Sequence, residues 1–427
     1  FNDLPACVNS EGELHICENN FSEERFRNYI KTRFDQNSNN YFSSLEIEAV
    51  FTICCSGIII RSLKGIEFFK NLTELDCSRN RLTTLDISKN VDLTDLFCGN
   101  NELTALDVSH NAKLTTLSCD FNKLRTFDVS KNTELTSLYC NWNQLTSLDV
   151  SKNVALADLS CDGNKLTVLD VSHNAKLTTL SCECNELATL DVSDNARLAV
   201  LECDSNQLTA LDVGKNNELW NLNCSSNKLT SLDVSNNIEL TYLSCYYNQL
   251  TSFDVSKNTK LSSVTCDIQS IGIIVANRKG FDIRTLISKE NLSKVTVDSD
   301  IGTYDSETGI IVFNTERSSF KYYFDIGKNG LTMEVTVYFD SHEHSYGDYI
   351  SNGDGTHTRR CTVEGCNASE TENCSGGTAT CKDKAVCEIC GEEYGELNPE
   401  NHVGGTHIEH EKAATCTEKG YTGDTYC

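Results

Sequence analysis

Leucine and cysteine recur at a fixed spacing through the middle of the chain. Ten cysteines from Cys77 to Cys266 each lie 21 residues from the next, and every unit reads like LTELDCSRNRLTTLDISKN at 72–90. A period of this length is typical of a solenoid of stacked repeats. In LxxLxC the second leucine and the cysteine share one face of a strand, while the residues beside them point outward. The pattern therefore predicts one short strand per coil over residues 58–266, stacked into a parallel sheet with leucine, cysteine and valine behind it.

Further ladders follow the same period. An asparagine ladder stays in phase from Asn80 to Asn248 and changes to glutamine at Gln269, where we expect the solenoid to end. Its side chains are expected to satisfy backbone groups where the chain leaves each strand. The aspartate ladder from Asp86 to Asp254 is interpreted as turn capping, with a calcium array as the alternative. One inward thiol per coil behaves as a small hydrophobe, so we interpret the cysteine ladder as core packing rather than as a metal or redox site.

The unit resembles the leucine-rich repeat, LxxLxCxxNxL, with cysteine in place of the usual third leucine. In such a solenoid a ligand binds at the positions that the repeat leaves free, which are the outward strand residues and the two residues before each ladder asparagine. Aromatic and acidic residues alternate there, and exposed aromatics offer rigid contact area at a low entropic cost. We expect a protein or carbohydrate ligand, with a basic or glycan ligand favoured and ordinary surface filling as the alternative. The candidate residues are Phe97, Phe121, Tyr139, Trp142, Tyr242, Tyr246, Tyr247, Asp120, Asp162 and Asp204.

The first 57 residues predict a helical cap. Residues 22–34, SEERFRNYIKTRF, place apolar side chains on one helical stripe, with Ser22 as the N-cap. The next twelve, DQNSNNYFSSLE at 35–46, look like an EF-hand loop. Its sixth position is Asn40 rather than glycine and only two ligands are charged, so we expect weak calcium binding; a capping motif without an ion is the alternative. The ligands would be Asp35, Asn37, Asn39, Tyr41 through its carbonyl, Ser43 and Glu46.

Residues 267–340 lose the period and alternate apolar with polar residues in short runs, such as FKYYF at 320–324. This alternation predicts a small β-sandwich without chemistry of its own.

Residues 341–427 are rich in cysteine and histidine and predict tandem modules, the last of them truncated. The knuckle CEICG at 387–391 brings two thiols to one side of a tight turn, as a structural zinc site requires. A disulfide framework is the alternative. The predicted ligands are Cys374, Cys381, Cys387 and Cys390 in one module, His344, Cys361 and Cys366 in a diverged copy that also contains His357, and His410, Cys416 and Cys427 in the truncated copy.

A helical cap followed by leucine-rich coils resembles the internalin-like surface proteins of Gram-positive bacteria and related gut anaerobes. The resemblance implies an immunoglobulin-like module over residues 267–340 and an extracellular or cell-surface location. The Cys/His modules resemble C-terminal repeats in surface proteins of anaerobic clostridia. We interpret the chain as a processed or excised fragment of such a protein.

Composition narrows the function further. The formal net charge of −26 argues against a nucleic-acid partner, because the phosphate backbone would be repelled. No apolar stretch approaches the roughly 18 residues of a membrane span, and we find no catalytic motif. The sequence therefore predicts an adhesin-type binding protein and not an enzyme. Two alternatives are the targeting region of a larger exported enzyme and a protein that handles metal through its C-terminal modules.

Overall fold

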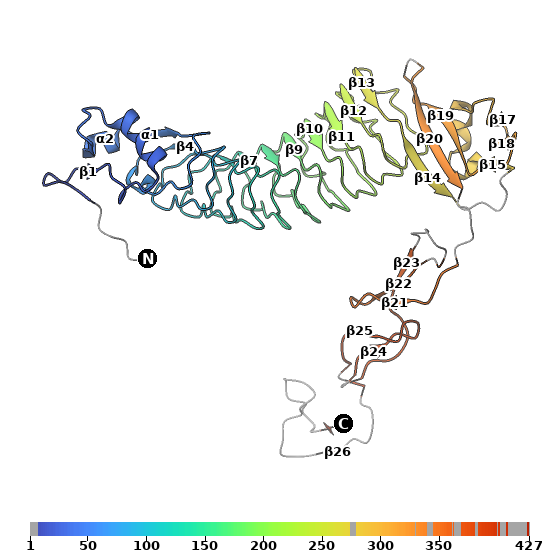
Figure 1. Cartoon of the computed structure of the whole chain (residues 1–427). Helices are drawn as coiled ribbons and strands as arrows, with labels where there is room; N and C mark the ends of the chain where they lie inside the picture. The colour runs from blue at the N-terminus through green and yellow to red at the C-terminus, as the bar shows by residue number, and fades with distance from the viewer. Residues whose placement is uncertain are drawn as a thin grey trace. The chain divides into compact units, whose positions relative to one another are not determined.

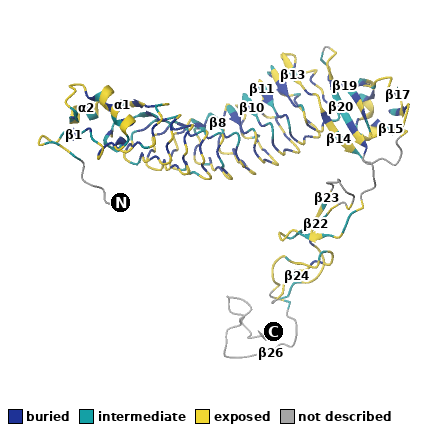
Figure 2. Cartoon of the chain, viewed as in Figure 1, coloured by how far each residue is buried: buried dark blue, intermediate teal, exposed yellow. Residues whose placement is uncertain are grey.

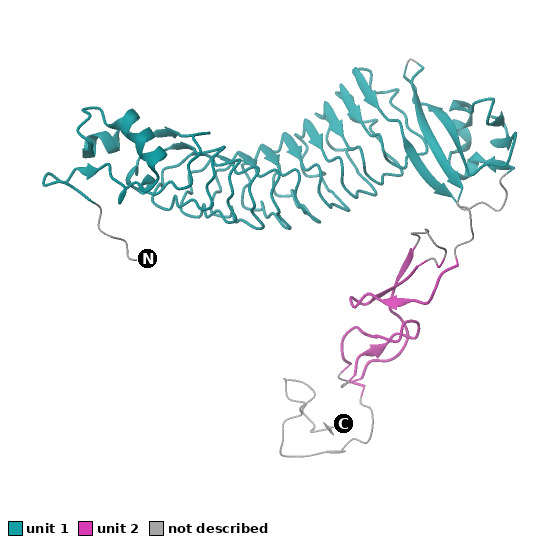
Figure 3. Cartoon of the chain, viewed as in Figure 1, with its two compact units in different colours: residues 1–339 teal, residues 340–427 magenta. Residues whose placement is uncertain are grey.

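The computed structural model describes residues 7–273, 279–328, 330–339, 345–360, 362, 369–380, 383–398, 400–401, 407–408 and 425–426. The chain forms two compact units, residues 1–339 and 340–427 (Figure 3). No helix among the described residues is long and apolar enough to cross a membrane.

The first unit begins with a small helical cap. Strands β1 (Leu14–His15) and β2 (Tyr41–Phe42) pair antiparallel, and helices α1 (Glu24–Phe34) and α2 (Ser44–Glu48) flank β2 in the sequence. Phe26 and Ile30 of α1 are buried, as their stripe predicts. The predicted N-cap is wrong: Glu23 occupies that position without a side-chain bond, so Ser22 lies one residue too early.

Eleven short parallel strands follow in sequence order, one per coil, along the concave side of the curved solenoid (Figure 1). The leucines stay in register, Leu75 beside Leu96 and Leu96 beside Leu117. The middle residue of a strand is buried and its neighbours are more exposed, as in β5 and β6, and Figure 2 colours the residues by this burial. The strands are β3 (Thr52–Cys54), β4 (Glu74–Asp76), β5 (Asp95–Phe97), β6 (Thr116–Ser118), β7 (Ser137–Tyr139), β8 (Asp158–Ser160), β9 (Thr179–Ser181), β10 (Val200–Glu202), β11 (Asn221–Asn223), β12 (Tyr242–Ser244) and β13 (Ser263–Thr265).

The ladder cysteines are core residues. Cys77 to Cys266 are unpaired and buried, and burial raises the pKa of thiols such as Cys98 and Cys224 to about 12. Such thiols stay protonated and pack as small apolar groups.

The asparagine ladder holds adjacent coils together. The Asn101 amide donates to the carbonyls of Cys77 (3.0 Å) and Cys98 (3.0 Å), and its oxygen accepts from the backbone N–H of Leu82 at 2.9 Å. Gln269 continues the hydrogen bonds of this ladder with its longer amide: it donates to Cys245 and Cys266 and accepts from Leu250, at 2.8–3.0 Å. The parallel sheet itself ends at β13, before Gln269.

A second, fully buried asparagine ladder was not anticipated. Asn111 donates to the carbonyls of Ile87 and Asn90, and the pattern repeats in every coil from Asn90 to Asn258.

The aspartate ladder caps turns, as predicted. The Asp86 carboxylate accepts from the backbone N–H of Ser88 at 3.0 Å, and this bond lowers the pKa of Asp86.

Two sheets complete the first unit. One has the order β14-β20-β19-β16 and the other β15-β18-β17. Phe281 and Phe313 of one sheet each pack against Phe320 and Phe339 of the other, with ring centroids 5.2–5.8 Å apart, as a small sandwich requires. The strands are β14 (Gln269–Ile273), β15 (Gly280–Asp282), β16 (Val295–Thr296), β17 (Gly302–Asp305), β18 (Ile310–Phe313), β19 (Ser319–Asp325) and β20 (Thr332–Phe339), and the 3-10 helices η1 (Ile66–Phe68), η2 (Ile283–Thr285) and η3 (Lys289–Lys294) lie outside the sheets.

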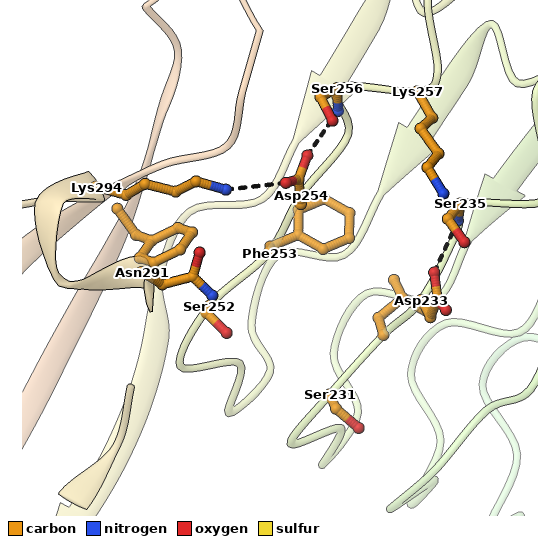
Figure 4. Close-up of a pocket in the computed structure, with 12 residues that line it drawn as sticks. Ser231, Asp233, Ser235, Ser252, Phe253, Asp254, Ser256, Lys257, Asn291 and Lys294 are labelled. Atoms are coloured by element: carbon orange, nitrogen blue, oxygen red, sulfur yellow. Dashed lines mark hydrogen bonds and ion pairs between the residues drawn. The ribbon is translucent and has the colours of Figure 1, made fainter. Parts of the chain in front are cut away.

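These sheets are joined to the last coils by polar contacts. The buried Tyr322 hydroxyl donates to the carbonyl of Thr251 at 2.8 Å. A recess at the junction contains the Asp254 carboxylate, held between Lys294 at 2.9 Å and Ser256 (Figure 4). Partial burial opposes ionisation of Asp254, but the Ser256 bonds and the Lys294 charge outweigh it and lower the pKa to about 2.

The second unit is small. Its strands are β21 (Ile350–Ser351), β22 (Thr356–Arg360) and β23 (Ser369–Asn373) in one antiparallel sheet, and the pairs β24 (Ala385–Val386) with β25 (Glu393–Tyr394) and β26 (His407–Ile408) with β27 (Thr425–Tyr426).

Candidate ligand-binding face and metal centre

The residue before each ladder asparagine takes a left-handed backbone conformation. Its N–H still donates to the next coil, as Phe121 does to the Asn141 carbonyl at 2.8 Å. The φ angles lie between 51° and 61° in Arg79, Asn100, Phe121, Trp142, Gly163, Cys184, Ser205, Ser226, Tyr247 and Ile268. The left-handed conformation is unfavourable for residues other than glycine. The hydrogen bonds repeated between coils hold these residues in that conformation.

Two of these side chains form an exposed aromatic platform. The rings of Phe121 and Trp142 stack with centroids 6.0 Å apart and planes 13° from parallel, and about half of each side chain is exposed. The next residue of the ladder is Gly163, where a Cβ would lie 2.6 Å from the indole. The indole therefore lies directly over the Gly163 backbone, which holds it in place.

A ladder of acids and amides runs beside the platform. Each side chain accepts the backbone N–H of the next coil: Asp120 from Asn141 at 2.8 Å, Asn141 from Asp162 at 2.7 Å, and Asp162 from Glu183 at 2.9 Å. Burial raises the pKa of Asp120 and of Asp162 despite these bonds.

The ladder continues into a carboxyl pair. Burial, then a hydrogen bond to Asp204 and the charges of Asp204, Asp162 and Glu202 raise the pKa of Glu183 to about 8. A protonated Glu183 can donate to the Asp204 carboxylate, so this part of the face carries less negative charge at neutral pH than its composition implies.

The EF-hand-like loop turns its carboxylates onto its own backbone. The buried Glu46 carboxylate accepts from Ser43 N–H (2.9 Å), Ser43 Oγ (2.8 Å) and Gln36 N–H (2.9 Å), and with Ser43 it forms the capping box of α2. Asp35 accepts from Asn39 and Asn40. Asn40 has φ 70°, the conformation in which an EF-hand carries glycine. Calcium binding by this loop stays a prediction.

The second unit brings four potential metal ligands together. One ligand atom from each of His357, Cys374, Cys387 and Cys390 lies within 4.8 Å of the others. His357 Nδ1 is 3.6 Å from Cys374 Sγ and 3.4 Å from Cys387 Sγ, and the sulfurs of Cys374 and Cys390 are 3.8 Å apart.

Our prediction grouped Cys374, Cys387 and Cys390 with Cys381, whereas in this cluster the same three cysteines lie with His357. His357 belongs to the stretch that we assigned to a diverged copy, but β22 and β23 pair and bring it to the next module's cysteines. The remaining predicted zinc ligands, Cys381, His344, Cys361, Cys366, His410, Cys416 and Cys427, lie outside the described residues.

No family model matches the sequence, and no curated protein sequence matches it significantly. Among solved structures, the functional domain of InlJ from Listeria monocytogenes is described as including a cysteine ladder. It is 28% identical to this chain with a TM-score of 0.56, over 76% of this chain and 98% of that one. This chain is an internalin-like leucine-rich repeat protein. The internalin InlF of the same organism, 21% identical with a TM-score of 0.50 over 62% of this chain and 87% of that one, supports the fold alone.

The internalin-like protein does not bring all candidate ligand-binding residues together. Tyr242, Tyr246 and Tyr247 belong to the coil of β12, five strands from the coil of Trp142, which is roughly 24 Å at the usual strand spacing. Tyr246 and Tyr247 form their own pair with centroids 5.2 Å apart. The face therefore carries two aromatic clusters, with Asp162, Glu183 and Asp204 in the coils between them.

Tyr139 is less available than its neighbours. Its hydroxyl donates to the Asp158 carboxylate at 2.5 Å, and burial, then this bond, raise the pKa of Tyr139 to about 12. Phe97, in β5, is only partly exposed.

Sequence reasoning missed Asn141 and Gly163 as parts of the site. Asn141 occupies the repeat position of Asp120 and Asp162, and Gly163 that of Phe121 and Trp142. Their position in the repeat, rather than their residue type, could have identified them.

Proposed function

We propose that this chain is the binding region of a secreted or cell-surface bacterial protein, an adhesin-type module that recognises a protein ligand through its strand face. The observation that carries the proposal is the stacked pair Phe121 and Trp142, half exposed and held in place by the Gly163 backbone. Rigid, exposed aromatics are typical of interface hot spots, because they lose little entropy on binding.

The charge beside the platform favours a ligand with basic groups. Asp120 and Asp162 are fixed by backbone N–H groups, and the chain carries a net charge of −26. Preorganised carboxylates bind a cationic side chain without reorganising, and the overall charge speeds its approach.

A carbohydrate ligand is the second candidate, because a flat aromatic platform flanked by hydrogen-bond acceptors also suits a sugar ring. The other alternative, the targeting region of a larger exported enzyme, uses the same face.

The two tryptophans of the chain offer a direct test. Trp220 lies just before β11, outside the platform, so Trp220→Ala leaves Trp142 as the single tryptophan reporter. Candidate ligands come from arrays of host and bacterial surface proteins and of glycans. A hit should change Trp142 emission and should lose at least about tenfold in affinity with Trp142→Ala.

Trp220→Ala should retain that affinity. Binding that is unchanged in Trp142→Ala and in Phe121→Ala would contradict the proposal. Hits confined to glycans would favour the second candidate.

A further inference from the structure

We propose that His357, Cys374, Cys387 and Cys390 form one closed, tetrahedral structural zinc site, and that this ion holds the second unit together. The proposal is independent of the strand-face function. The sequence predicted that Cys374, Cys387 and Cys390 bind zinc together with Cys381. In the proposed site the fourth ligand is His357, from the diverged copy that precedes them.

The distances fit zinc. Zinc bonds sulfur at about 2.3 Å and nitrogen at about 2.0–2.1 Å. Tetrahedral geometry then places two sulfurs about 3.8 Å apart and sulfur and nitrogen about 3.5–3.6 Å apart. The Cys374–Cys390 sulfurs are 3.8 Å apart, and His357 Nδ1 is 3.6 Å and 3.4 Å from the Cys374 and Cys387 sulfurs.

The surroundings of the cluster suit a metal better than a disulfide. Three thiols converge on one imidazole nitrogen, so a disulfide between any two of them would leave the third thiol beside the histidine.

The histidine is oriented for coordination. Its ring is fully buried, with Nδ1 toward the sulfurs and Tyr349 edge-on at 4.4 Å between centroids. Nε2 has no hydrogen-bond partner within the described residues, and the Glu372 carboxylate lies 3.9 Å away. Metal-bound histidines typically direct their second nitrogen toward such a carboxylate, which fixes the tautomer.

The site also takes the place of a hydrophobic core. Among the described residues of the second unit, the buried apolar side chains are those of Cys374 and Cys387 alone. The four ligands join the β22–β23 hairpin to the turn after β24. With little apolar area to bury, the unit needs a metal to fold, and four protein ligands leave no position open for catalysis.

The test uses the full chain purified under reducing conditions without added metal. Elemental analysis of Cys390→Ser and of His357→Asn should show about one zinc per chain less than the parent protein. Cys184→Ser, an exposed cysteine of the solenoid, is the matched control and should lose none. His357→Cys keeps four ligands and should keep the zinc.

Cobalt substitution identifies the ligands. The parent protein should give the visible absorption of tetrahedral cobalt with thiolate ligands, and His357→Cys should shift it by replacing nitrogen with sulfur. The proposal is overturned if the parent protein contains no zinc or if zinc content is equal in Cys390→Ser and the parent. It is also overturned if peptide mapping of a second preparation, purified without reductant, finds Cys374, Cys387 or Cys390 in disulfides.

Discussion

A Cβ on Gly163 would lie 2.6 Å from the indole of Trp142, one coil earlier in the solenoid. Gly163 is the single glycine among the ten left-handed positions that precede the asparagine ladder and Gln269. The other nine accept a side chain in this conformation, so a glycine is required here because the indole occupies the space above it rather than because of the backbone angle.

Gly163→Ala should therefore displace Trp142 and break its stack with Phe121. We expect a loss of about 1–3 kcal/mol in stability from the clash and the left-handed backbone, and a changed Trp142 emission in the Trp220→Ala background. Ser226→Gly removes a Cβ at the same repeat position. It is the control that measures how much the left-handed backbone alone costs a residue with a side chain. Unchanged emission in Gly163→Ala would mean that the glycine does not position the platform.

The carboxyl pair makes stability depend on pH. The pKa of Glu183 is raised from 4.5 to about 8 in the folded chain, so the folded state holds a proton that the unfolded state releases above pH 4.5. The unfolded state then binds fewer protons, and stability falls as pH rises from about 4.5 to about 8. The melting temperature should drop by a few degrees across this window, and Glu183→Gln should flatten the profile.

Glu186→Gln, an exposed neighbour in the same coil, serves as the control and should keep the parent profile. A Glu183→Gln profile parallel to the parent would show that the carboxyl group is not protonated in the folded state.

The period of the sequence predicts much of the fold, since each coil repeats the same few contacts. Leu96 was placed correctly in a strand, Cys98 in the core and Asn101 in the ladder, because the same residue types occupy the same positions in the neighbouring coils. The asparagine pattern did not predict the role of Gln269, whose amide makes the same three bonds with one more methylene group.

The site was harder to predict, because it depends on contacts between particular side chains. The repeat places Phe121, Trp142 and Gly163 at one position of consecutive coils, but it does not show that the rings stack or that the indole lies over a glycine. The grouping of His357 with Cys374, Cys387 and Cys390 was not predicted, because the pairing of β22 with β23 brings together residues that lie in separate stretches of the sequence.

Gln269→Ala should fray the last coil. The substitution leaves the buried carbonyls of Cys245 and Cys266 and the N–H of Leu250 without their partner, which costs about 1–3 kcal/mol. Hydrogen exchange should accelerate at Leu250 while coils near β5 stay protected. Gln207→Ala, an exposed glutamine, should leave exchange at Leu250 unchanged, and Gln269→Asn tests whether the longer reach is required.

Thiol reactivity should separate the cysteines by position. Cys54 and Cys184 are exposed, whereas the ladder thiols are buried and burial raises the pKa of Cys98 to about 12. Because the thiolate is the reactive form, a short alkylation pulse under native reducing conditions should label Cys184 and Cys54 well before any ladder cysteine. Isotope-coded alkylation after unfolding then gives the protected fraction at each site. A ladder cysteine that reacts as fast as Cys184 would contradict its role in the core.

Calcium should stabilise the cap weakly if the EF-hand-like loop binds it. Glu46 would have to exchange the N–H groups of Ser43 and Gln36 for the ion, so we expect a dissociation constant near 10⁻⁴–10⁻³ M, as in weak extracellular sites. Glu46→Gln keeps the capping box, because glutamine performs the same backbone contact, but removes the charged ligand. Millimolar calcium should raise the melting temperature of the parent and of Glu48→Gln, an exposed control, and leave Glu46→Gln unchanged. An equal rise in Glu46→Gln would assign the calcium effect to another site, and no rise in the parent would show that the loop is a capping motif without an ion.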